Sequence, residues 1–134
     1  MEMLVDICSS SQERSRYIEK MLRAYMEAGE FPVSYQCFYE MDTLKNDLMV
    51  QLPHILILAM EDIDNQEIGV WLRGFSKKPR IIWIGEDKRF GLASYRISAT
   101  YFILYPPRQE EFFDSLKRCL HQLSGKEPVY SGEI

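Results

Sequence analysis

Cysteine and histidine are scarce in this chain of 134 residues. The three cysteines, Cys8, Cys37 and Cys119, are an odd number and form no CxxC pair, which argues against a disulfide scaffold or a cysteine-based zinc site. They lie on apolar segments, so we expect buried free thiols in a cytoplasmic protein. The two histidines, His54 and His121, fall at the start of a predicted strand and on the last predicted helix. Neither position suits the base of a serine or cysteine nucleophile.

Long apolar runs, basic clusters and glycine-rich loops are absent as well. No run approaches the roughly 20 residues of a membrane-spanning helix, and the N-terminus lacks the features of a signal peptide. The formal net charge is −4 and the basic residues are scattered, which argues against a nucleic-acid-binding surface. The seven glycines form no phosphate-binding loop, so no nucleotide or flavin cofactor is expected.

What the chain does contain is a regular alternation of apolar, strand-like segments with amphipathic helices. Strands are expected over residues 3–8, 33–38, 54–59, 80–84 and 100–104, and helices over residues 12–28, 41–50, 65–75, 88–96 and 109–123. The continuous apolar run from Ile55 to Ala59 is typical of a parallel strand that is buried on both faces. The pattern predicts an α/β protein, a flavodoxin-like (βα)5 doubly wound parallel sheet with strand order 2-1-3-4-5 and helices on both faces.

This pattern covers one domain, residues 1–123. Residues 124–134 lose the periodicity and are expected to be a tail or the start of a linker to a possible output domain. At the other end of the chain, Ser10 and Glu13 have the spacing of a capping box and predict the start of the first helix. Glu61 and Asp62, directly after the third strand, are expected to solvate a loop or cap the third helix.

Two stretches carry a resemblance to a known family. "MLVDICSSSQERSRYIEKML" (residues 3–22) and "RIIWIGEDKRFGLASYRISATYFILYPP" (residues 80–107) resemble, without gaps, the receiver domains of bacterial response regulators, in particular the LytTR-type subgroup. The likeness spans residues 3–123. The family's fifth strand ends in Tyr-Leu-Leu-Lys-Pro, and here the corresponding residues are Phe102-Ile103-Leu104-Tyr105-Pro106.

The residues that carry receiver chemistry differ at every matching position. The resemblance places Ala59 where the family has its aspartate nucleophile, and Ser9 and Ser10 where it has the acidic pair that binds Mg²⁺. Gly85 replaces the switch hydroxyl and Tyr105 the lysine. These departures imply a pseudo-receiver that has lost the phosphorylation site: not an enzyme, with no cofactor and no metal.

Several alternatives stay open on the sequence. Glu61 and Asp62 could act as relocated acids that still take a phosphoryl group, whereas Asp6, inside the first strand, is not expected to reach the site. Tyr105 is either a plug of the former phosphate pocket or a partly exposed tyrosine at a strand end. A vacated crevice at the strand ends could also hold a small ligand.

The resemblance implies a role in signal transduction through protein–protein interaction. The expected partner is a protein or a second copy of the chain, with DNA reached only through a possible LytTR-like output domain and no contact with a membrane. Such a domain would regulate transcription; the alternative is a free-standing receiver-like adaptor. Phe90 and Tyr95 on the predicted fourth helix and Phe113 on the fifth are the candidate interaction face.

Overall fold

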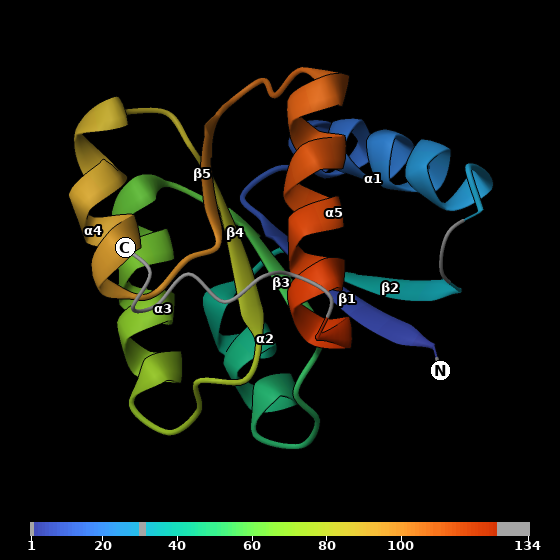
Figure 1. Cartoon of the computed structure of the whole chain (residues 1–134). Coiled ribbons are helices and arrows are strands. Elements are labelled where there is room, and N and C mark those ends of the chain that lie inside the picture. Colours follow the sequence, from blue (N-terminus) through green and yellow to red (C-terminus); the bar gives the residue numbers. More distant parts are fainter. Residues whose placement is uncertain (1, 30–31, 126–134) are drawn as a thin grey trace, which may run out of the picture.

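The computed structural model describes residues 2–29 and 32–125. They form one parallel sheet in the order β2-β1-β3-β4-β5, as Figure 1 shows. The strands are β1 (Met3–Ser9), β2 (Val33–Phe38), β3 (Ile55–Ala59), β4 (Arg80–Gly85) and β5 (Tyr101–Leu104). The predicted (βα)5 sheet and its strand order are therefore confirmed.

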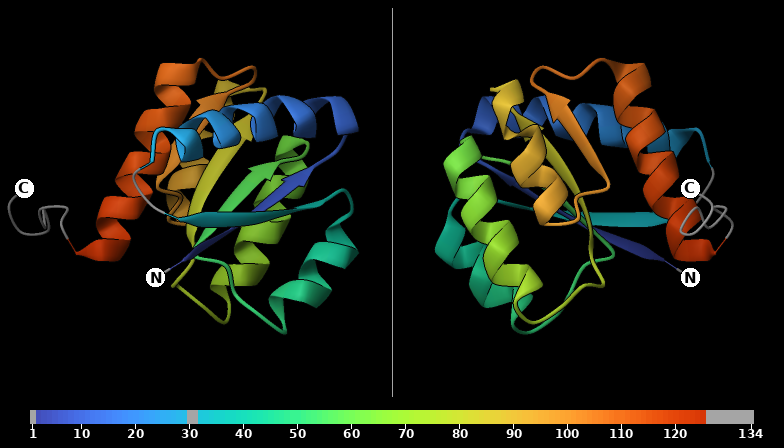
Figure 2. Two further views of the ribbon diagram at one scale, coloured as in Figure 1. Left: turned by 90° about the vertical axis from the view of Figure 1, so that its right-hand side faces the viewer. Right: turned by 60° about the vertical axis from the view of Figure 1, so that its left-hand side comes forward.

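Helices cover both faces of the sheet (Figures 1 and 2). The helices are α1 (Gln12–Glu27), α2 (Met41–Leu48), α3 (Asp62–Arg73), α4 (Gly91–Arg96) and α5 (Gln109–Ser124), with a short 3-10 helix, η1 (Lys88–Phe90), before α4. The helices α1 and α5 lie on one face, and α2, α3 and α4 lie on the other. Figure 2 shows these two layers with the sheet between them.

The alternation of side chains along the strands builds two apolar cores, one under each layer. One core joins β1, β3 and β4 to α1 and α5 through Val5, Ile7, Ile18, Leu22, Ile57, Ile82, Phe112 and Leu116. The other joins β3 and β4 to α2 and α3 through Leu44, Leu48, Leu56, Leu58, Ile68, Leu72 and Trp83. All five residues of β3 are buried, which is why this strand is apolar throughout.

Two predictions about helix starts are wrong. The cap of α1 is Ser11, whose hydroxyl accepts a hydrogen bond from the Arg14 backbone N–H at 3.1 Å, whereas Ser10 is exposed and forms no capping box with Glu13. The helix α3 begins at Asp62 rather than at residue 65, because its first turn carries acidic residues that the apolar pattern does not reveal.

The fourth helix is shorter than predicted. The expected helix over residues 88–96 is divided into η1 and α4, and Phe90 belongs to η1. At the C-terminal end, α5 runs through Ser124, and the left-handed backbone of Gly125 (φ 76°) ends it. From residue 126 onward the predicted tail lies outside the described residues.

The cysteines are free, with Cys8 and Cys119 buried and Cys37 half-buried. Burial raises the pKa of the Cys8 thiol to about 12, so this cysteine is an inert part of the core. Within residues 2–29 and 32–125, none of the helices combines the length and the apolar character needed to cross a bilayer.

Candidate functional site

Four of the five residues expected at the phosphorylation-site positions meet at the carboxyl ends of the strands. Ser9 and Ala59 are neighbours in the last register pair of β1 and β3. Gly85 ends β4, and its carbonyl accepts a hydrogen bond from the Tyr105 backbone N–H at 2.7 Å, just after β5. Ser10 follows β1 and points to solvent. Ligands bind at this edge in open parallel sheets, so we call it the strand-end crevice.

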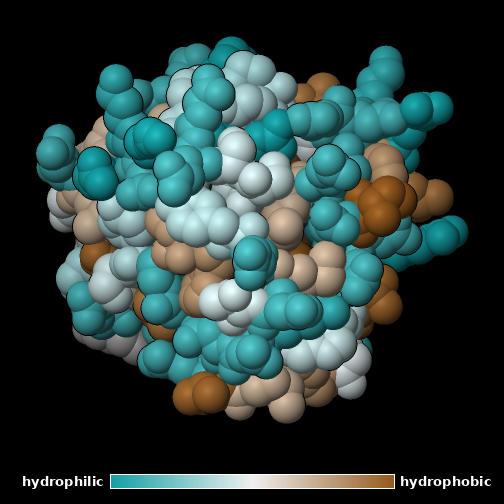
Figure 3. All heavy atoms as spheres, turned by 180° about the vertical axis from the view of Figure 1, so that it is seen from behind, coloured by the Kyte–Doolittle hydropathy of each residue, from teal (hydrophilic) through white to brown (hydrophobic). Residues whose placement is uncertain are grey.

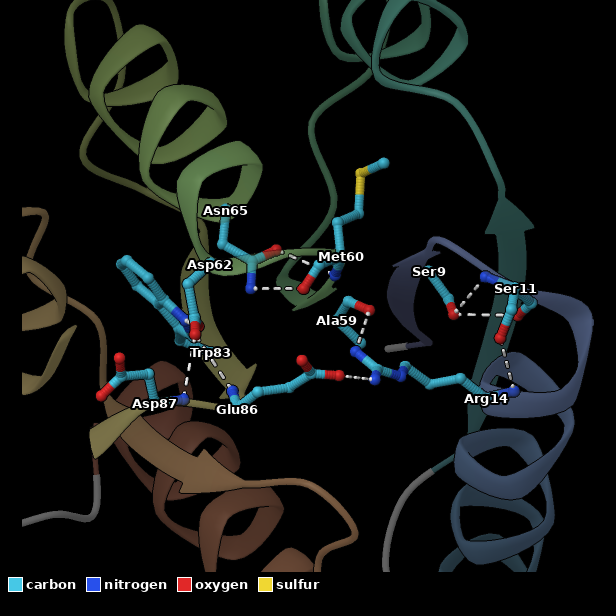
Figure 4. A network of polar contacts seen from close by, with 10 residues as sticks. All are labelled: Ser9, Ser11, Arg14, Ala59, Met60, Asp62, Asn65, Trp83, Glu86 and Asp87. Atoms are coloured by element: carbon cyan, nitrogen blue, oxygen red, sulfur yellow. Dashed lines mark hydrogen bonds and ion pairs between the residues drawn. The ribbon is translucent and has the colours of Figure 1, made fainter. Parts of the chain in front are cut away.

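The strand-end crevice is filled by Arg14, a residue that the sequence did not single out. Its side chain reaches from the first turn of α1 across the ends of β1 and β3 (Figure 4) and is only 12% exposed. One guanidinium nitrogen donates to the Ala59 carbonyl oxygen at 3.2 Å, and another pairs with the Glu86 carboxylate. The protein thus places its own cation beside Ala59, the position that the resemblance matches to the family's nucleophile.

The ring of Tyr105 packs against this guanidinium. The guanidinium carbon of Arg14 is 4.3 Å from the centroid of the Tyr105 ring, a cation–π contact. The rings of Tyr17 and Tyr105 form a T-shaped pair with their centroids 5.7 Å apart. The Tyr17 hydroxyl donates a hydrogen bond to the Pro107 carbonyl oxygen at 3.0 Å. Burial raises the pKa of the half-buried Tyr105. Tyr105 is thus a partly exposed tyrosine at the strand end, as one of the two alternatives has it, and its ring also packs against the Arg14 guanidinium.

Asp62 is the second charged group that the fold draws into the strand-end crevice. One carboxylate oxygen accepts from the indole N–H of Trp83 at 2.8 Å. The other accepts from the backbone N–H groups of Glu86 and Asp87 at 3.1 and 3.0 Å (Figure 4). The expectation that Asp62 caps a helix or solvates a loop is wrong, because these three donors hold its carboxylate inside, where it fastens β4 and the loop after it to α3. Glu61 is exposed and makes no side-chain cap.

The carboxylate of Asp62 explains why residue 85 is a glycine. A Cβ atom added to Gly85 would overlap Oδ1 of Asp62 and would lie 2.9 Å from the indole nitrogen of Trp83. A serine or threonine at this position, as in the family that the sequence resembles, has no room while Asp62 keeps its place. Gly85 and Asp62 are therefore coupled in space, because the side chain of one occupies the room that a side chain on the other would need.

Comparison with solved structures gives the fold a context. The response regulatory domain of protein mrkE from Klebsiella pneumoniae matches with a TM-score of 0.78 at 14% identity, over 92% of this chain and 99% of that one. A receiver domain (CheY-like) from Methylobacillus flagellatus matches with a TM-score of 0.70 at 10% identity, over 89% and 99% of the two chains. The chain has the receiver fold.

A third structure with the receiver fold, a DNA-binding response regulator of the LuxR family from Staphylococcus aureus, matches with a TM-score of 0.66 at 14% identity, over 87% of this chain and 98% of that one. No family model matches the sequence, and a search of curated proteins finds no match either. At such low identity the likeness establishes the fold, and the chemistry has to be argued from the residues.

The Mg²⁺ ion implied by the resemblance does not fit the residues found here. A hard dication needs several oxygen ligands, mostly carboxylates. The Ser9 hydroxyl is instead engaged with the Ser11 backbone, donating to its carbonyl at 3.0 Å and accepting from its N–H at 3.3 Å. The Ala59 carbonyl oxygen faces the guanidinium of Arg14, a cation that repels a second one. Among the described residues, no three His, Cys, Asp or Glu side chains are grouped to hold a metal ion.

Asp6 stays away from the strand-end crevice of this receiver fold, as expected. It is fully buried in β1, and one carboxylate oxygen accepts from the Gln36 side-chain amide on β2 at 3.0 Å. The same amide donates to Asp47 on α2 at 3.1 Å. Burial raises the pKa of Asp6 to about 6, and the nearby charge of Asp47 adds to the rise.

The three aromatic residues of the predicted interaction face do not form one exposed surface. Phe90 turns inward, with its ring centroid 5.9 Å from that of Trp83. Phe113 packs edge-on against Tyr25 of α1 at 5.1 Å. Only Tyr95 is well exposed, at 79%. The sequence missed Leu92 on α4 and Leu104 on β5, which are 61% and 43% exposed.

Proposed function

We propose that this domain is a pseudo-receiver of the LytTR type, which acts through protein–protein interaction without phosphorylation. The observation that carries the proposal is the guanidinium of Arg14 between Ala59, Glu86 and Tyr105. A built-in cation takes the place in which a phosphorylated receiver would gather Mg²⁺, lysine and a phosphoryl group. The domain is then held in one state, because a ligand shifts an equilibrium only when it binds two states differently.

The contacts of Asp62 argue against a receiver with relocated acids. A nucleophilic carboxylate must present an unengaged oxygen to the phosphodonor beside a metal ion. Both oxygens of Asp62 accept hydrogen bonds from buried or half-buried donors, and only 9% of the residue is exposed. Glu61 points to solvent, and among the described residues no three His, Cys, Asp or Glu side chains are grouped to hold a metal ion beside it. Neither acid is placed to replace the missing aspartate.

The proposal includes a downstream role in the cytoplasm. A pseudo-receiver of this type would regulate a DNA-binding, LytTR-like output domain and hence transcription. The S. aureus structure with the same fold is a DNA-binding response regulator, which supports a link to such outputs. The alternative is a free-standing adaptor, and the mass of the intact native product distinguishes a domain joined to an output from an isolated one.

We predict that the domain takes no phosphoryl group. Incubation with acetyl phosphate and Mg²⁺, followed by intact-mass measurement, is expected to leave the mass of the protein unchanged. A receiver domain with its aspartate intact serves as the positive control. A stoichiometric adduct that disappears in Asp62→Asn or Glu61→Gln would show that a relocated acid does the chemistry, and the proposal would be wrong.

We further predict that the interaction surface is formed by α4 and β5, around Leu92, Tyr95 and Leu104. Aromatic and aliphatic side chains exposed close together are typical of protein interfaces. Figure 3 shows the face opposite to the view of Figure 1, where hydrophobic and hydrophilic residues are mixed. A double variant, Leu92→Asp with Tyr95→Asp, is expected to weaken self-association at least about tenfold, measured by light scattering over a concentration series.

The matched control for this experiment is Val50→Asp, which introduces the same charge at an apolar residue that is 85% exposed, beyond the end of α2. This variant should associate as the unmodified protein does. Phe113→Asp is unsuitable as a test, because Phe113 packs against Tyr25 and its loss would disturb the fold. Equal effects of the control and the double variant would count against an α4–β5 interface.

A further inference from the structure

Three arginines meet at the end of the sheet that lies opposite to the strand-end crevice. Arg80 begins β4, Arg96 ends α4, and Arg118 lies in the second half of α5. Together with Thr100 and Gln122 they line a pocket of about 500 Å3. None of the described residues that line it is acidic. We name this feature the arginine pocket.

The arginine pocket concentrates positive charge in a chain whose net charge is −4. Arg73, at the end of α3, lies close enough to Arg80 for the two charges to interact. Burial lowers the pKa of Arg73, and the charge of Arg80 lowers it further. Like charges held close together raise the free energy of the folded state, and an anion bound between them would lower it.

The backbone around the arginine pocket is fixed by hydrogen bonds. The Arg73 guanidinium donates to the carbonyl oxygens of Ile97 and Ser98 at 2.8 and 3.3 Å. Ser98 has a positive φ of 57°, which is uncommon for a residue with a side chain. The Thr100 hydroxyl donates a hydrogen bond to the side-chain carbonyl oxygen (Oε1) of Gln122 at 3.3 Å. These hydrogen bonds hold the segments that surround the arginine pocket in a defined position.

One donor in the arginine pocket lacks an acceptor within the described residues. Nε of Arg80 is buried and has no hydrogen-bond partner there. A buried N–H without a partner costs about 1–3 kcal/mol, and a turn of the Arg80 side chain toward a bound anion would remove this cost. The guanidinium carbon of Arg118 lies 5.6 Å from the centroid of the Tyr101 ring, a cation–π contact. Tyr95 stands at the rim with its ring exposed.

We propose that the arginine pocket binds a small molecule that carries a diphosphate or polyphosphate group. Guanidinium groups match the oxygens of phosphate through paired hydrogen bonds, and several of them suit a multiply charged anion better than a single carboxylate. The volume admits a ligand larger than one phosphate. This inference does not rest on the proposed function, because the arginine pocket and the strand-end crevice lie at opposite ends of the strands.

The test is titration calorimetry with pyrophosphate as the probe, at low ionic strength. Saturable binding of one pyrophosphate per chain is expected, with a dissociation constant below about 1 mM. The double variant Arg96→Ala with Arg118→Ala should weaken binding at least about tenfold. Arg80→Lys, which keeps the charge but loses the planar fork, should weaken it by a smaller factor.

The matched control is Arg16→Ala with Arg108→Ala, which removes the same charge at two exposed arginines outside the arginine pocket. Its affinity should stay within about twofold of the unmodified protein. In amide NMR spectra, pyrophosphate should shift Ser98, Thr100 and Gln122, and leave Ser9 and Ala59 unmoved. Absence of saturation, equal weakening in the control, or shifts centred on Ser9 and Ala59 would each overturn the proposal.

Discussion

Replacing Gly85 with alanine is expected to lower the free energy of unfolding by about 3 kcal/mol. The new methyl group would overlap the Asp62 carboxylate, and the carboxylate would have to move away. Its departure would leave the buried indole N–H of Trp83 without an acceptor and would free the backbone N–H groups of Glu86 and Asp87. Urea unfolding, followed by tryptophan fluorescence, should show a lower midpoint with an unchanged slope.

Gly91→Ala is the matched control for this prediction. Gly91 is the first residue of α4, and a Cβ atom there would meet nothing within 4 Å. Because alanine favours the helix over glycine, this variant should be neutral or slightly more stable. Asp62→Ala should also destabilise the protein, but less than additively with Gly85→Ala, since either change alone removes the same contacts. Fully additive effects would show that Gly85 and Asp62 are not coupled.

The sequence was sufficient for the fold because the fold depends on local patterns. Each strand is an apolar run, and each helix has its own apolar face, so the order of elements follows directly from the periodicity. Parallel connections then restrict the topology to a few arrangements. The assignment of Ser9, Ala59, Gly85 and Tyr105 to one site came instead from the resemblance to receiver domains. The structure brings these four residues together because the carboxyl ends of parallel strands meet at one edge.

Arg14 could not be predicted in this way. Its contact with the Ala59 carbonyl bridges 45 residues of sequence, and an arginine in the first turn of a helix gives no local sign that it turns inward. The residues that differ from the receiver family at the matched positions nevertheless give a signal for a cation at this place. Ser9, Ser10 and Ala59 are small residues at positions where the resemblance expects carboxylates, and Tyr105 offers the face of an aromatic ring, to which a guanidinium is attracted.

Asp62 was misjudged for a similar reason, since its three donors lie 21 to 25 residues farther along the chain. Here the signal was Trp83, an indole in the middle of an apolar strand. A buried indole N–H usually needs an acceptor, and an acid at the end of the neighbouring strand is a suitable one. Phe90 and Phe113 were misplaced because a periodic pattern does not show which neighbouring helix covers an aromatic ring.

Stability is expected to depend on pH through Asp6. The pKa of this buried carboxyl group is raised from its ordinary value of 3.8 to about 6, chiefly by burial. Between these two values the folded protein binds more protons than the unfolded chain, so the free energy of unfolding falls as the pH rises through this range. The decrease in the free energy of unfolding that is due to Asp6 should approach about 3 kcal/mol above pH 6. This decrease should be absent below pH 3.8.

The variant Asp6→Asn separates this effect from other titrating groups, because an amide keeps the shape of the side chain and carries no charge. At about pH 8 the variant should be more stable than the unmodified protein by roughly 2 kcal/mol, and at about pH 4 the difference should vanish or reverse. Urea midpoints measured across this range provide the comparison. The matched control is Asp114→Asn, at an exposed position on α5, which should keep the pH dependence of the unmodified protein.

The sign of the difference in the free energy of unfolding between Asp6→Asn and the unmodified protein shows whether burial destabilises the Asp6 carboxylate. A buried carboxylate stabilised by its partners would have a lowered pKa, and its removal would destabilise the protein most at high pH. The Gln36 amide supplies one hydrogen bond to Asp6, but Oδ2 is buried without a partner among the described residues, and Asp47 stands nearby. One neutral donor does not offset the burial of a charge. The stability of Asp6→Asn relative to the unmodified protein could instead be lower at about pH 8 than at about pH 4. That result would mean that the surroundings stabilise the carboxylate, and this account of Asp6 would be wrong.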